Sequence, residues 1–254
     1  FLRPPALNAI ISVCSTRDRF ADDVNFKGGC LLNENHGWGA VMLSYSSRPA
    51  DPALRPDWRA DWLARLEAEP FLAPRWASHQ SSDAYWRHGS VCEDWSAIKV
   101  PVLSVGGWAD NYMNTVGHLM EQQKSVVKGL MGPWVHQYPH TAVPGPAIGF
   151  LAEAVRWWDH WLKGIENGVG DDPAYRAYML HSEAPDASIV HRAGHWVAEQ
   201  EWPSPRVIRQ VMALSPNGVL GGDGGALAVA VNTPQHLGFT TGEFFPMGLN
   251  AEMP

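Results

Sequence analysis

The pattern of apolar and polar positions divides the chain into stretches of different character. Residues 6–14 form an apolar run with the length and β-branched content of a buried strand, and they lie in the first stretch, residues 1–21. Residues 22–95 are rich in tryptophan, proline and charge and lack strand-like alternation, although residues 57–69 have a helical pattern. The pattern therefore predicts a core strand followed by a helical insertion.

Strands and helices alternate between residues 96 and 171. The expected elements are a strand at 100–105, a helix at 111–123, a strand at 125–131 and a helix at 147–163 that ends at Gly164. Two buried strands that flank a helix are typical of a βαβ unit with a parallel sheet. We therefore expect an α/β fold whose core combines residues 1–21 with residues 96–171, and whose helical cap is residues 22–95.

A turn-rich segment at residues 167–173 marks another change of pattern. Three strand-like stretches follow it, with Gly, Pro and Asn clusters between them: residues 174–181, 206–214 and 227–231. A series of strands without helices suits an all-β sandwich or jelly roll. We therefore place a domain boundary near residue 172 and expect residues 172–254 to form a truncated jelly roll.

Composition limits the classes of function. The chain has 254 residues, with 19 basic and 26 acidic side chains and a net charge of −7. This balance argues against a nucleic-acid or anionic membrane partner, because both need a dense basic face. No apolar run approaches the ~20 residues that span a bilayer. Three cysteines, Cys14, Cys30 and Cys92, are too few and too scattered for a disulfide framework or a zinc site, and Cys14 is expected to be a small buried hydrophobe.

The two ends of the chain predict that it is a piece of a longer protein. The first core strand follows Phe1 after one short turn, and residues 244–254 supply no closing element. A targeting signal would lie outside such a piece, so the cellular location is undetermined. The three cysteines carry no redox signal, so a reducing compartment, the cytoplasm, is only the default expectation.

Candidate chemistry lies in the two loops that follow the strands predicted at 100–105 and 125–131. The first loop ends in Asp110 and the second in His136, and both contain glycines that let the backbone turn sharply. Reactive groups of open α/β sheets gather at the carboxyl ends of parallel strands. An acid followed by a histidine is the order of the last two members of the α/β-hydrolase triad. We therefore predict Asp110 and His136 as catalytic residues.

Other roles for these residues stay open at this point. Asp110 precedes a predicted helix and could be its N-cap. His136 could be a loop histidine bonded to a carbonyl group, and His140 lies close enough in sequence to take its role. Trp157 and Trp161 share one helix face and are expected in the core rather than at a cofactor.

The remaining polar residues predict no metal site and no cofactor. The eleven histidines form no H-E-x-x-H frame. Adjacent acids are expected to be solvated surface carboxylates, because neighbouring side chains diverge on regular elements: Asp22-Asp23 and Glu93-Asp94. The sequence contains no G-x-S-x-G, G-x-G-x-x-G or Walker pattern, so a serine nucleophile is expected outside this chain.

Three motifs carry a family resemblance: Gly106-Gly107-Trp108-Ala109-Asp110-Asn111-Tyr112, Gly132-Pro133-Trp134-Val135-His136, and Arg156-Trp157-Trp158-Asp159-His160-Trp161-Leu162-Lys163-Gly164. They resemble the X-Pro dipeptidyl-peptidase (S15) and cocaine-esterase-like (CocE/NonD) hydrolases, a group that includes α-amino acid ester hydrolases and glutaryl-cephalosporin acylases. Two further segments are similar to the start of the family's cap and of its jelly roll: Asp22-Asp23-Val24 with Gly28-Gly29-Cys30-Leu31-Leu32, and Gly194-His195-Trp196.

The resemblance implies an α/β-hydrolase core with a helical cap and a C-terminal β-sandwich. It implies a serine hydrolase that cleaves an ester or amide bond of a small molecule or short peptide, without a cofactor. In the family the serine and the oxyanion hole lie before the strand with which this chain begins, so the chain alone is expected to be inactive. Trp108 and Trp134 would pack under the loops or wall the acyl pocket, and packing is the preferred expectation. A homo-oligomer is left open. The alternative is a non-catalytic binding or structural protein that uses the cap and sandwich surfaces.

Overall fold

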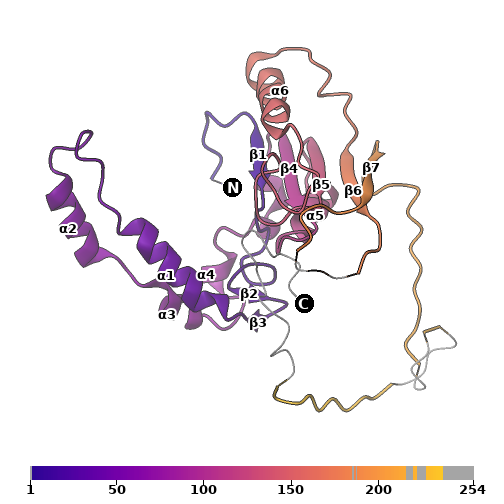
Figure 1. Ribbon diagram of the computed structural model, residues 1–254, viewed down its shortest axis with the longest axis horizontal. Coiled ribbons are helices and arrows are strands. Elements are labelled where there is room, and N and C mark those ends of the chain that lie inside the picture. The colour runs from indigo at the N-terminus through magenta and orange to yellow at the C-terminus, as the bar shows by residue number, and fades with distance from the viewer. Residues whose placement is uncertain (1, 185, 187, 216–219, 222–226, 237–254) are drawn as a thin grey trace.

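Five strands form one sheet in the computed structural model, in the spatial order β1-β4-β5-β6-β7 (Figure 1). The strands are β1 Ile10–Val13, β4 Val102–Gly107, β5 Val127–Gly132, β6 Tyr175–Leu180 and β7 Gly194–Glu199. Neighbours from β1 to β6 pair in parallel, and β7 pairs antiparallel with β6. The structure describes residues 2–184, 186, 188–215, 220–221 and 227–236. The predicted α/β class is confirmed.

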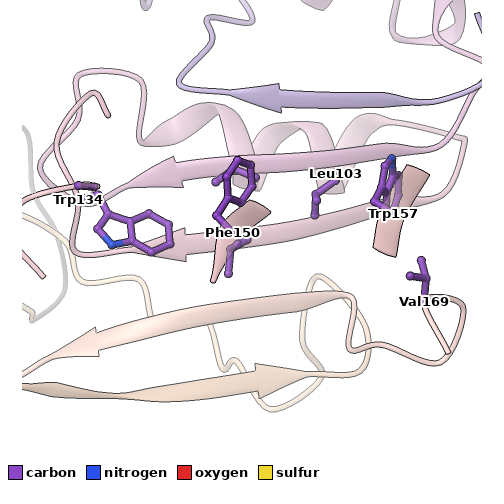
Figure 2. Close-up of a cluster of buried hydrophobic side chains, with 8 residues drawn as sticks. Leu103, Trp134, Phe150, Trp157 and Val169 are labelled. Carbon is purple, nitrogen blue, oxygen red and sulfur yellow. The ribbon is translucent and has the colours of Figure 1, made fainter. Parts of the chain in front are cut away.

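Helices α5 (Asn114–Gln122) and α6 (Phe150–Lys163) pack on opposite faces of this sheet. Adjacent residues of a strand point to opposite faces, so Leu130 of β5 joins the core under α6 while Met131 joins the core under α5. Figure 2 shows the cluster on the α6 side, which contains Trp134 and Trp157. The result is a three-layer α/β/α arrangement.

The amphipathic pattern correctly predicted α6 and its end. Gly164 follows the helix with a φ of 68°, the left-handed conformation that glycine adopts without a side-chain clash. Trp157 is 2% exposed in the core cluster, and the Trp157 and Trp161 rings lie 5.7 Å apart. Both tryptophans therefore have the packing role that was expected of them.

Residues 22–95 contain a short hairpin and a group of helices, which Figure 1 shows to one side of the sheet. The hairpin is β2 (Phe26–Lys27) with β3 (Cys30–Leu31), and the helices are α1 (Glu34–Ser46), α2 (Trp58–Ala68), α3 (Leu72–Ala77) and α4 (Ala84–Arg87), followed by the 3-10 turns η1 (Val91–Glu93) and η2 (Trp95–Ala97). Helix α2 occupies the predicted helical stretch. Phe26, Trp76 and Trp86 form a separate buried cluster there, which gives the insertion a small aromatic core of its own.

Strands β6 and β7 extend the core sheet, whereas the sequence assigned residues 174–181 to the all-β region. The parallel pairing of β6 with β5 follows from the connection between them, because α6 makes a crossover that returns the chain to the same sheet. The segment at 167–173 is also packed: Val169 is 2% exposed in the α6-side core. The division into core, cap and sandwich otherwise stays a prediction.

The strands expected at residues 206–214 and 227–231 are absent from the described part of these stretches. Among the described residues of this region, one isolated antiparallel β-bridge pairs Leu214 with Leu220. Val211 and Val231 are each 81% exposed, so these apolar runs find no sheet to pack on among the described residues. The rest of the predicted jelly roll lies outside the described residues. Among the helices that the structure describes, none has the length and apolar character needed to cross a membrane.

Candidate functional site

The loops after β4 and β5 are held together by main-chain hydrogen bonds. Trp108 N–H donates to the Gly132 carbonyl at 2.9 Å, and Ala109 N–H donates to the Trp134 carbonyl at 3.1 Å. Any side chain at Gly107 would overlap the Trp134 carbonyl oxygen, so only glycine permits this approach. The two loops therefore form one rigid unit at the carboxyl edge of the sheet.

This unit brings Asp110 and His136 into contact. Oδ1 of Asp110 lies 3.2 Å from Nδ1 of His136 and also accepts the Tyr112 N–H at 3.1 Å. The Asp110 side chain is completely buried, whereas the His136 side chain is 28% exposed. A buried carboxylate therefore orients an imidazole whose other side reaches solvent.

Cys14 is a third member of this site, and no local pattern in the sequence points to it. It follows β1 with a φ of 50°, a conformation uncommon for residues other than glycine. Its sulfur, a carboxylate oxygen of Asp110 and a ring nitrogen of His136 all lie within 4.8 Å of one another. Burial, and then the charge of Asp110, raise the pKa of the Cys14 thiol well above its usual range. Cys14 is therefore a protonated thiol at neutral pH.

A pocket of about 170 Å³ opens beside these residues and is lined by Val13, Cys14, His136, Gln137 and Tyr138. A larger cavity, about 390 Å³, lies along β1 and touches neither Asp110 nor His136. The smaller pocket is the one of the two that the partly exposed imidazole lines. Trp108 and Trp134 line neither: Trp134 is 1% exposed, and the Trp108 indole donates to the Tyr178 carbonyl at 2.7 Å. Trp134 therefore packs under the loops, as preferred, whereas Trp108 is 36% exposed and is held at the surface by that hydrogen bond.

The structure also decides between the other roles considered for these residues. Helix α5 begins at Asn114 with Met113 as its N-cap residue, so the N-cap interpretation of Asp110 is wrong. Asp110 lies three residues before this N-cap residue, and its carboxylate accepts the Tyr112 N–H instead. His140 stacks on the Phe150 ring, with centroids 6.3 Å apart, so it is His136 that pairs with the acid.

The expectation that Asp22 and Asp23 are solvated is wrong, since both are buried. Asp22 pairs with the Lys27 ammonium, which also donates to the Asn111 carbonyl at 2.7 Å. Asp23 accepts the Tyr112 hydroxyl at 2.9 Å, and burial raises its pKa. These contacts join the start of the insertion to the loop that contains Asp110. By contrast, Glu93-Asp94 is exposed as predicted.

Comparisons with known proteins give the family from a family model and the fold from solved structures. The model of the X-Pro dipeptidyl-peptidase (S15) family matches residues 2–138, more than half of the chain. Two crystal structures of a CocE/NonD family hydrolase from Staphylococcus aureus share the fold, with TM-scores of 0.57 and 0.55 at 19% and 20% sequence identity. The likeness covers 87% of this chain but 35% and 34% of those chains, so this chain spans about a third of their length. No curated protein sequence matches it. The chain belongs to the X-Pro dipeptidyl-peptidase (S15) family.

Proposed function

We propose that Asp110 and His136 are the acid and the base of a Ser-His-Asp triad in a serine hydrolase. The observation that supports this most is the 3.2 Å contact between Asp110 Oδ1 and His136 Nδ1. It has the form that the triad requires: a buried acid held by a second hydrogen bond, and a histidine exposed to a pocket. Membership of the S15 family supports the same assignment.

The hydrogen bond to Asp110 assigns the proton of neutral His136 to Nδ1 and leaves the lone pair on Nε2. In the proposed reaction, Nε2 takes the hydroxyl proton of a serine as the serine oxygen attacks an ester or amide carbonyl. The resulting imidazolium gives that proton to the leaving group, and an acyl-serine remains. A water molecule then repeats the cycle and releases the acid. The negative charge of Asp110 stabilises the imidazolium in both steps.

We place the serine outside residues 1–254. The sequence holds no G-x-S-x-G, and a nucleophilic group that the described residues place beside His136 is the thiol of Cys14. A thiol whose pKa is raised reacts poorly, because the thiolate is the nucleophile. The proposed substrates are esters, amides or short peptides of a size that a small-molecule pocket accepts.

The test uses the full-length gene product, in which we place the serine upstream of this chain. We expect one serine to be labelled by a fluorophosphonate probe and p-nitrophenyl esters to be hydrolysed. His136→Ala should abolish hydrolysis, since no other group takes the proton at neutral pH. His140→Ala is the matched control, a neighbouring histidine outside the pocket, and should leave turnover nearly unchanged. No labelled serine and no hydrolysis would instead support a binding protein, whereas an active His136→Ala variant would refute His136 as the base.

A further inference from the structure

Three side chains from separate parts of the sequence form a compact set of metal-binding atoms. Cys14 comes from the end of β1, Asp110 from the loop after β4, and His136 from the loop after β5. Sulfur, carboxylate oxygen and ring nitrogen all lie within 4.8 Å of one another. Thiolate, imidazole and carboxylate are the ligand types that Zn²⁺ takes in proteins.

We propose that Cys14, Asp110 and His136 bind a thiophilic divalent cation such as Zn²⁺ or Cd²⁺, and that the bound cation inhibits the enzyme. A second observation points to a ligand here. Oδ2 of Asp110 is buried and has no hydrogen-bond partner among the described residues, in a side chain that is completely buried. A buried carboxylate oxygen without a partner is unfavourable, and a cation would supply the missing interaction.

The geometry fits a tetrahedral ion. Metal–ligand distances of about 2.0–2.3 Å place the ligand atoms about 3.3–3.8 Å apart. Asp110 Oδ1 and His136 Nδ1 are already 3.2 Å apart, and the Cys14 sulfur, within 4.8 Å of both residues' ligand atoms, has to approach by about 1–1.5 Å at most. The pocket of about 170 Å³ that Cys14 and His136 line leaves a fourth position for water.

The charges also balance. Binding releases the Cys14 thiol proton to solvent and forms a sulfur–metal bond, so a thiolate and the Asp110 carboxylate together offset the two positive charges of the ion. The neutral imidazole of His136 adds no charge. The buried site then carries no net charge, whereas either anion alone would be costly in that place.

The bound ion would block His136 through either ring nitrogen. Coordination by Nδ1 displaces the Asp110 hydrogen bond and puts the imidazole proton on Nε2, which then cannot accept the proton of a serine. Coordination by Nε2 occupies that lone pair directly. This inhibition rests on the proposed function, whereas the binding of the ion does not.

Cadmium titration of the full-length gene product tests the binding, read from the ultraviolet thiolate-to-cadmium charge-transfer band in the presence of a phosphine reductant. We expect a saturating band that Cys14→Ser removes. Cys92→Ser is the matched control and should keep it, because Cys92 is another half-buried thiol, with Asp18 beside it, outside the three-ligand cluster. Outer-shell partners of metal ligands are worth about 10–100-fold in affinity, so His136→Gln should weaken binding at least that much.

A second measurement needs no variant at the site. X-ray absorption of zinc bound to the otherwise unaltered protein should show one sulfur at about 2.3 Å, with nitrogen or oxygen completing the shell. A shell without sulfur, or a cadmium band that survives in Cys14→Ser, would overturn the proposal. If the band requires Cys14 but the ion leaves ester hydrolysis intact, the metal site stands and inhibition is wrong. An active enzyme that binds no ion refutes the metal site and leaves the proposed function standing.

Discussion

Replacing Asp110 by asparagine tests the catalytic dyad with little change in shape. The Tyr112 N–H donates to Oδ1 of Asp110, so it favours the asparagine rotamer that keeps an oxygen at that position. That oxygen can still accept the Nδ1–H of His136, and the amide nitrogen takes the place of Oδ2, an atom that makes no hydrogen bond which the substitution would break. The substitution therefore removes a charge while keeping the orientation of the imidazole.

The size of the loss follows from the missing attraction between the carboxylate and the imidazolium. Two unit charges 3.2 Å apart attract by about 5 kcal/mol at an effective dielectric constant of about 20. His136 is 28% exposed, so solvent screens part of this and about 3–5 kcal/mol remains. We expect the turnover of Asp110→Asn to fall by about 10² to 10⁴. The corresponding aspartate-to-asparagine change in a well-studied serine protease lowers kcat by a factor of about 10⁴.

The assay is kcat/KM for a p-nitrophenyl ester, measured on the full-length gene product together with a thermal melt. Asp83→Asn is the matched control: Asp83 also binds a histidine, His79 Nδ1 at 2.7 Å, but in the insertion, where it caps α4. Asparagine caps a helix as well as aspartate, so this control should keep both activity and melting temperature. An Asp110→Asn variant that melts normally and loses less than about tenfold in turnover would refute the dyad.

The remaining predictions concern stability and the chain by itself. Gly107→Ala should destabilise the fold by about 1–3 kcal/mol or more, because its methyl group has no room, whereas Gly117→Ala in α5 faces open space and should stabilise by about 0.5–1 kcal/mol in denaturant melts. Burial raises the pKa of Asp172, but the paired Arg156, at 2.6 and 2.8 Å, outweighs this and leaves that pKa below its usual value. Asp172→Asn should therefore cost about 1–2 kcal/mol at neutral pH, and its deficit should vanish as the pH falls below about 4; a deficit that persists in acid would contradict this. The isolated 254-residue chain, if folded by circular dichroism, should hydrolyse no ester, and hydrolysis that depends on Cys14 would contradict the assignment of the nucleophile.

Much of the core could be predicted because its signals are local. Runs of apolar residues at 100–105 and 125–131 have strand length, and the α6 stretch repeats its apolar positions with the helical period. The prediction that Asp110 and His136 approach each other needed one further rule, that parallel strands end at the same edge of a sheet. Local pattern and a topological rule were therefore sufficient for the dyad.

Other features depend on contacts between distant residues, for which the sequence has no local signal. Asp22 and Asp23 look like solvated acids, and their burial becomes favourable only because Lys27 and the Tyr112 hydroxyl meet them in the fold. The placement of β6 could have been predicted, because strand, helix and strand in succession form a βαβ unit. The Gly, Asn and Asp content of residues 167–173 instead predicts a domain boundary there.

Cys14 shows how the sheet order creates chemistry that spacing conceals. It lies 96 residues before Asp110 (110 − 14), yet β1 is the neighbour of β4, and β4 is the neighbour of β5. Three adjacent parallel strands therefore present their last residues at one edge, where a thiol, a carboxylate and an imidazole meet. The positive φ at Cys14 occurs where this strand leaves the sheet, at the lining of the pocket. A residue that looked like a core hydrophobe thus becomes part of the site, because the order of the strands decides which strand ends meet.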